Sequence, residues 1–311
     1  MPSFAALVDW PEPMLELAGF LASFVATGAI GFRFVVIRPW LRRGGAAGDL
    51  HALARKGARQ AAIVGCLGAM VALALHVADL HAQSVERHIP LATLIGSKDT
   101  PIALGLEVAA LLGFAMAAAG AGPGWFLAAA GVILGAILPA FAGQWLRLVN
   151  PIHVLAGGFW IGTLFHVVTA GILPALRSGL TPERRGPWVR DMIARFSPLA
   201  LASAAVLAAF GVITAWRHLK TLSAFWTTPY GITLIVKLCL VACVLALGAF
   251  NFRRQRPLLG TDAGARSLRG SATAELAMAT LVLVVTSLLV SMPSPKPPSA
   301  APPSVHVASG R

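Results

Sequence analysis

The chain has 311 residues, of which 57% are hydrophobic and only 12% are charged, and its formal net charge is +13. Soluble domains carry about twice this fraction of charged residues, so the composition excludes an ordinary soluble globular protein. The basic residues lie in short connectors between apolar segments, and this placement argues against nucleic-acid binding.

Apolar residues gather in about eight segments, each long enough for a helix to cross the roughly 30 Å of hydrocarbon in a bilayer. Backbone groups in lipid must be hydrogen-bonded within their own segment, so we predict an all-α, polytopic membrane bundle. In chain order, the expected spans are residues 12–37, 60–80, 101–119, 125–145, 151–173, 196–216, 230–250 and 272–291.

These spans predict two membrane halves of four helices each, residues 1–150 and residues 151–292. Residues 293–311 are rich in Pro, Ser and Ala, and we expect them to form a disordered periplasmic tail. The connectors are too short to hold a soluble catalytic domain, and no phosphate-binding P-loop motif occurs. We therefore do not expect an enzyme.

Lys and Arg are divided unequally between the two sets of connectors. One set, within residues 38–59, 177–195 and 253–269, holds sixteen of them, and the other set holds seven. Connectors rich in Lys and Arg remain in the cytoplasm, so the first set is predicted to be cytoplasmic. Both termini are then periplasmic, and the expected location is a bacterial inner membrane.

With this orientation, most histidines lie at or beyond the outer face. These are His76, His81, His88, His153, His218 and His306. Imidazole is a common copper and zinc ligand. His76 and Asp79 share one helix face, His81 joins them only if the helix has ended, and His153 opens the fifth span. The alternative is that these polar residues mark helix ends.

Three further ionisable residues lie inside spans, where a charge is costly and points to function or to a partner. These are Glu107 in the third span, Lys237 in the seventh and Glu275 in the eighth. Lys237 and Glu275 are expected at different depths, so no direct pair is predicted, and Glu107 is another candidate partner. Simple structural pairing is the alternative.

The fifth span, NPIHVLAGGFWIGTLFHVV, carries two glycines four residues apart, Gly158 and Gly162. Such a pair lets another helix approach closely. His166 lies deep in this span, where it either meets another polar partner or packs neutral against a backbone carbonyl.

The second half of the chain resembles the copper resistance protein D (CopD) family. The stretches that carry this resemblance are NPIHVLAGGFWIGTLFHVV, RFSPLALASAAVLAAFGVITAW, YGITLIVKLCLVACVLALGAFN and SATAELAMATLVLVVTSLLVSMP. The matching residues are His153, Trp160, Gly162, Arg195, Phe196, Ser197, Gly211, Tyr230, Gly231, Lys237, Asn251, Glu275 and Pro293. Relatives often have a Gly-His pair before the fifth span, where this chain has Gly143 and Gln144. If that histidine binds metal in relatives, a neighbour such as His153 would have to substitute for it here.

The resemblance implies copper handling at the inner membrane, with copper received from a periplasmic carrier of the CopC type and moved inward. Copper is then the transported ion, and His76, Asp79, His81 and His153 are the candidate ligands. One alternative is a haem-binding redox protein with His76 and His153 as axial ligands. Another is a copper sensor or scaffold without transport.

Overall fold

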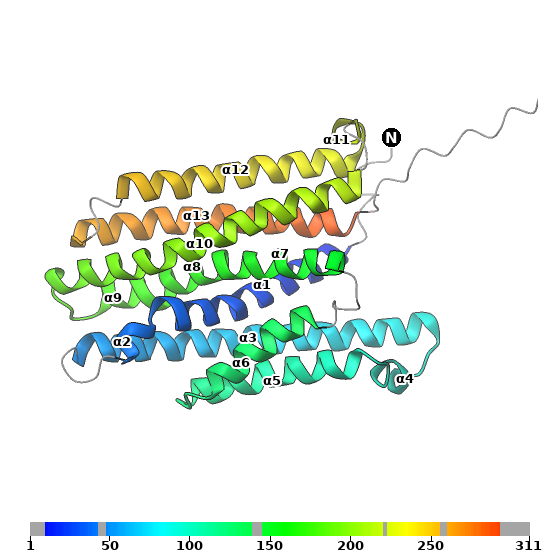
Figure 1. Cartoon of the computed structure of the whole chain (residues 1–311), viewed down its shortest axis with the longest axis horizontal. Coiled ribbons are helices and arrows are strands. Elements are labelled where there is room, and N and C mark those ends of the chain that lie inside the picture. The colour runs from blue at the N-terminus through cyan, green and yellow to red at the C-terminus, as the bar shows by residue number, and fades with distance from the viewer. Residues whose placement is uncertain (1–9, 43–47, 139–144, 220–222, 256–259, 293–311) are drawn as a thin grey trace, which may run out of the picture.

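The computed structural model describes residues 10–42, 48–138, 145–219, 223–255 and 260–292, and the regular structure in these ranges is helical. The elements are α1 (Glu12–Gly31), η2 (Phe32–Val36), α2 (Arg38–Arg42), α3 (Gly48–Arg87), α4 (Leu91–Ile95), α5 (Thr100–Ala118), α6 (Gly124–Ile137), η3 (Trp145–Leu148), α7 (Val149–Gly157), η4 (Gly158–Gly162), α8 (Thr163–His166), η5 (Val167–Ile172), α9 (Leu173–Arg177), α10 (Pro182–Leu219), α11 (Ala224–Thr227), α12 (Pro229–Gln255) and α13 (Asp262–Val290). Helices run roughly side by side along the long axis of the molecule (Figure 1).

Within the described residues, seven helices are long and apolar enough to cross a membrane. They are Glu12–Val36, Gly48–Arg87, Thr100–Ala118, Leu146–Arg177, Pro182–Trp216, Pro229–Phe250 and Asp262–Val290. The predicted all-α, multi-pass membrane fold is therefore confirmed. The fourth predicted span corresponds to α6, an apolar helix of 14 residues that rises only about 21 Å, and part of its predicted C-terminal end lies outside the described residues.

Helix α3 is longer than the predicted span, because it has 40 residues and continues without a break to Arg87. The polar segment after Leu80 contains no helix breaker, so the helix continues past the apolar segment into polar surroundings. His81 was expected to join His76 and Asp79 only if the helix had ended before it, and α3 continues past His81. Five residues along a helix turn a side chain by about 140° from its starting direction, so His81 is rotated away from His76.

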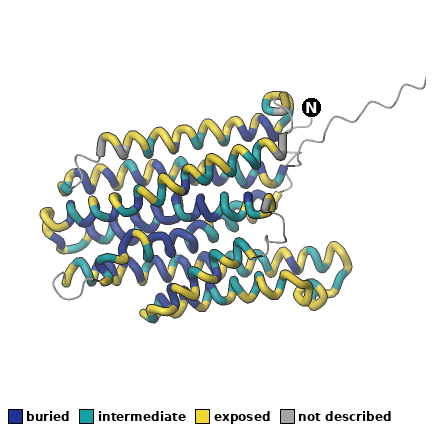
Figure 2. The backbone as a smooth tube through the Cα atoms, in the orientation of Figure 1, coloured by how far each residue is buried: buried dark blue, intermediate teal, exposed yellow. Residues whose placement is uncertain are grey.

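The most buried helices are α1 and the helix of residues 146–177, which is built from η3 to α9. Buried residues make up 56% and 61% of their apolar windows, against 11% for Pro182–Trp216 and 17% for Pro229–Phe250. Helices α3, α5 and α6 lie on one side of this centre, and α10, α12 and α13 on the other (Figure 1). The tube in Figure 2 accordingly turns from dark blue at the centre to yellow at the outer helices.

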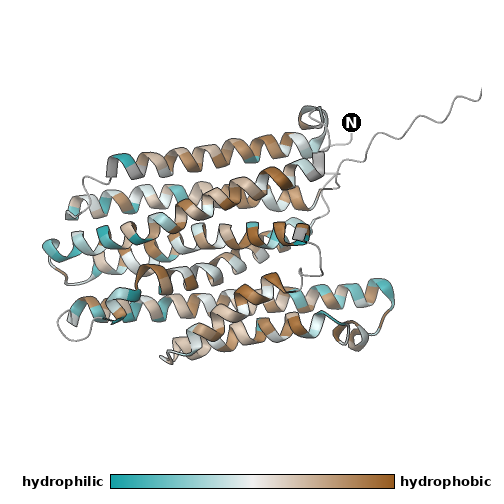
Figure 3. Cartoon of the chain, viewed as in Figure 1, coloured by the Kyte–Doolittle hydropathy of each residue, from teal (hydrophilic) through white to brown (hydrophobic). Residues whose placement is uncertain are grey.

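The exposed surface of the outer helices is apolar rather than polar, as Figure 3 shows for α5, α6, α10 and α12. Large exposed hydrophobic side chains on these helices and on α3 include Leu67, Leu112, Phe126, Leu201, Val212 and Leu238. A soluble monomer rarely exposes so large an apolar surface, whereas a bilayer solvates it.

The two central helices cross with their backbones in close contact. A Cβ added at Gly162 would overlap the backbone carbonyl of Phe24 and crowd Gly28, and one added at Gly28 would overlap the backbone of Gly162. Thr163 adds a hydrogen bond from its hydroxyl to the Gly28 carbonyl, at 3.4 Å. The close approach predicted for Gly158 and Gly162 is confirmed, and its partner is α1.

The Arg-rich connectors meet at one end of the bundle, formed by α2, α9, the start of α10 and the ends of α12 and α13 that face them (Figure 1). There, the Arg185 guanidinium donates to Asp262 of α13 at 2.5 Å and to the Leu180 carbonyl at 2.7 Å. Arg185 is buried, whereas Arg184 reaches from the same turn to Asp49 of α3 in an exposed pair.

We expect Arg185→Ala to lower the thermal unfolding midpoint in detergent by roughly 5–10 °C, because it removes a buried cation that joins α10 to α13. The matched control is Arg184→Ala, whose exposed pair with Asp49 contributes little, so its midpoint should fall by less than about 2 °C. Equal shifts for the two variants would contradict this account.

Candidate functional site

His76 forms a pair with Glu107 at the interface of α3 and α5. Nδ1 of the imidazole lies 2.9 and 3.0 Å from the two carboxylate oxygens, and both side chains are about one quarter exposed. A carboxylate accepts hydrogen bonds, so Nδ1 carries the proton and Nε2 of the neutral ring keeps its lone pair. Histidines that bind metals commonly have this arrangement, in which a carboxylate orients the ring through the opposite nitrogen.

Asp79 and His81 do not join this pair. Asp79 instead accepts a hydrogen bond from Gln83 at 2.8 Å on the exposed side of α3, and His81 is exposed. No group of three or more His, Cys, Asp and Glu side chains that would hold a metal occurs among the described residues. The four predicted ligands therefore do not form one cluster in this structure, and each stays a prediction on its own.

His153 lies near the start of α7, against α10, where a Cβ on Gly211 would be 3.6 Å from its ring. Its Nδ1 atom is buried and finds no hydrogen-bond partner among the described residues. A buried nitrogen without a partner is unusual and calls for an explanation such as an ion or a ligand. Lys237 of α12 is close enough to act on this histidine electrostatically.

Glu275 lies near the middle of α13, is 8% exposed and faces α12, where a Cβ on Gly248 would be 3.6 Å from Oε1. Lys237 precedes Gly248 by eleven residues on α12, a rise of about 16 Å. The expectation that Lys237 and Glu275 lie at different depths is therefore confirmed.

A groove of about 1100 Å³ opens beside Glu275, between α10, α12, α13 and the central helix. Trp160, Leu164 and Ala204 are among its mostly apolar lining residues, and Arg190 and Arg253 lie toward the Arg-rich end of the bundle. The sequence did not predict this groove. A signal for it in the sequence is that spans six to eight combine the carboxylate Glu275 with small residues such as Ala204 and Gly248.

His166 is fully buried and donates from Nε2 to the Val25 carbonyl of α1 at 2.9 Å. The rings of Phe32 and Phe165 pack against it. Of the two predicted alternatives, the structure supports packing against a backbone carbonyl. The π-helical turns η4 and η5 flank its helix α8, and such turns often accompany functional sites.

Taken together, the fold and these intramembrane polar groups define a polytopic α-helical membrane protein with ionisable side chains at several depths. Residues 190–289 match the family model described as Copper resistance protein D. This part of the chain, from α10 to α13, is therefore similar to the CopD family, as the resemblance in the sequence predicted.

Copper transport protein CutJ of Bacillus subtilis (strain 168) is 28% identical to this chain over 155 residues. The matched segment covers 50% of this chain and 27% of that protein, so it spans about a quarter of the relative's length. No solved structure gives a significant match.

Glu107 is the residue whose role the sequence assigned least well, because it was considered as a candidate partner for Lys237. The positions of His76 and Glu107 relative to the connector between α3 and α5 did offer a signal for their contact. His76 precedes the end of α3 by eleven residues, and Glu107 follows the start of α5 by seven. Two neighbouring antiparallel helices therefore place both groups at similar depths.

Three residues discussed from the sequence lie outside the described residues. They are Gly143 and Gln144, which depart from the family pattern, and His306.

Proposed function

We propose that this chain is a transporter that moves copper inward across a bacterial inner membrane, with copper received from a periplasmic carrier of the CopC type. The observation that carries the proposal is the match of residues 190–289 to the copper resistance family. The name of the relative that matches half of the chain supports the same ion and the same activity.

Two histidines near the end away from the Arg-rich connectors are the proposed outer copper contacts. His76 presents the lone pair of Nε2 because Glu107 holds the opposite nitrogen. His153 offers a buried Nδ1 atom that has no partner among the described residues. Nitrogen donors of this kind bind copper.

The central helix connects His153 to the groove beside Glu275. Trp160 lies seven residues, or about two turns, after His153, and it lines the groove together with Glu275. We propose that copper passes from the outer histidine toward the buried carboxylate along this helix. Each contact must be weak, because an ion that binds too tightly does not leave.

Lys237 is proposed to keep the outer site weak, because its ammonium repels a copper ion bound at His153. We expect Lys237→Gln to raise the copper affinity of the purified protein about tenfold, because the substitution removes a positive charge that repels the ion. Competition with a chromophoric chelator measures this affinity, and Lys98→Gln in the exposed connector before α5 is the control. Unchanged or weaker binding in Lys237→Gln would contradict this role.

Proteoliposomes test transport directly. Purified protein should carry external copper to a chelator trapped inside, faster than vesicles without protein. Copper binding without flux would instead indicate a sensor or scaffold. An absorption spectrum of the same preparation distinguishes the haem alternative, because a Soret band would indicate a bound haem.

A further inference from the structure

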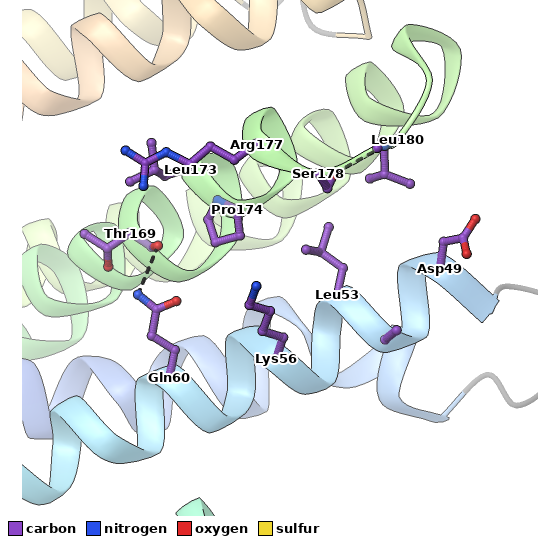
Figure 4. A pocket seen from close by; sticks show the side chains of 12 residues that line it. Asp49, Leu53, Lys56, Gln60, Thr169, Leu173, Pro174, Arg177, Ser178 and Leu180 are labelled. Carbon is purple, nitrogen blue, oxygen red and sulfur yellow. Dashed lines mark hydrogen bonds between the residues drawn. The ribbon is translucent and has the colours of Figure 1, made fainter.

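A second cavity, of about 630 Å³, lies at the Arg-rich end between α3 and the segment from η5 through α9 (Figure 4). It is separate from the groove beside Glu275 and shares none of its lining residues. Lys56 and Gln60 project into it from α3, and Leu173, Pro174 and Arg177 line it from the opposite side (Figure 4).

The cavity has excess positive charge. Lys56 and Arg177 are exposed, and neither takes part in the ion pairs of the described residues. The carboxylate that lines the cavity, Asp49, is paired with Arg184 at 2.9 Å. The two cations are therefore left to attract an anion.

The remaining walls are apolar or already hydrogen-bonded. Gln60 donates to the Thr169 carbonyl at 3.3 Å, which joins α3 to η5, and the Ser178 hydroxyl donates to the Ala175 carbonyl at 2.8 Å. Leu53 and Pro174 supply apolar surface beside the two cations. The cavity thus combines two cationic side chains, one from each wall, with apolar surface, which suits an amphipathic anion better than a fully hydrated one.

We propose that this cavity binds the phosphate group of an anionic phospholipid, with Lys56 and Arg177 contacting the phosphate and the apolar walls contacting the glycerol and the first part of the acyl chains. Lys and Arg are the side chains that recognise phosphate. Basic pockets between membrane helices, at the level of the headgroups, bind such lipids. The site goes beyond copper transport and does not depend on it.

The test is lipid binding to the purified full-length chain, measured as the rise of the unfolding temperature and by native mass spectrometry. Phosphatidylglycerol is the probe, and phosphatidylcholine is the zwitterionic comparison. We expect the wild type to bind phosphatidylglycerol more tightly than phosphatidylcholine, and Lys56→Gln with Arg177→Gln to weaken phosphatidylglycerol binding at least about tenfold.

The matched control is Arg55→Gln with Arg59→Gln, which removes two exposed charges from the same stretch of α3 without touching the cavity lining. This control should keep most of the affinity. Equal losses in both double variants, equal binding of the two lipids by the wild type, or equal stabilisation by inorganic phosphate alone would each overturn the proposal. The wild-type comparisons decide the question even if the double variant does not fold.

Discussion

Gly162→Ala is expected to destabilise the protein by about 3 kcal/mol, the upper range for overpacking a tight interface. The added methyl would overlap the Phe24 carbonyl and crowd the backbone at Gly28. Backbone atoms of a buried helix cannot move aside as a flexible side chain can, so α1 and the central helix must separate. Thermal unfolding in detergent should show a lower midpoint, and proteolysis should cleave the variant faster.

Gly105→Ala in α5 is the matched control. It adds the same methyl to another membrane helix, at a position where nothing lies within 4 Å of the new atom. Alanine also favours a helix over glycine by up to about 1 kcal/mol, so this variant should be unchanged or slightly more stable. A loss of stability as large as that of Gly162→Ala would show that the close crossing is not the cause.

His153→Ala is expected to reduce copper accumulation in cells at least about tenfold, because it removes the buried nitrogen that starts the proposed path along the central helix. His76→Ala should also reduce accumulation, and Glu107→Gln should have a smaller effect, since it disturbs only the orientation of the imidazole. Total cell copper, measured with each variant produced to the same level, tests all three.

His88→Asn is a suitable control for the histidine variants. His88 is exposed after the end of α3 and has a φ of 54°, a conformation that asparagine tolerates. It removes an imidazole from the same end of the molecule without disturbing the backbone, so accumulation should not change. Wild-type accumulation in both His76→Ala and His153→Ala would remove these residues from the mechanism.

Properties that depend on one segment at a time were predictable from the sequence. Whether a helix enters the membrane depends on the summed transfer free energy of about 20 consecutive residues, so the spans could be located before the structure was known. The concentration of Arg and Lys in alternate connectors is equally local. The glycine pair of the fifth span also predicted a close crossing, because small side chains permit one wherever a partner exists.

Only the tertiary structure decided which side chains meet. Glu107 contacts His76 rather than Lys237, Gly162 crosses α1 at Gly28, and Arg185 reaches Asp262. The physical reason is that a membrane helix is apolar both toward lipid and toward its neighbours, so hydrophobic periodicity does not mark the buried face. Packing sets the rotation of each helix about its own axis, and that rotation brought Glu107 of α5 to His76 of α3.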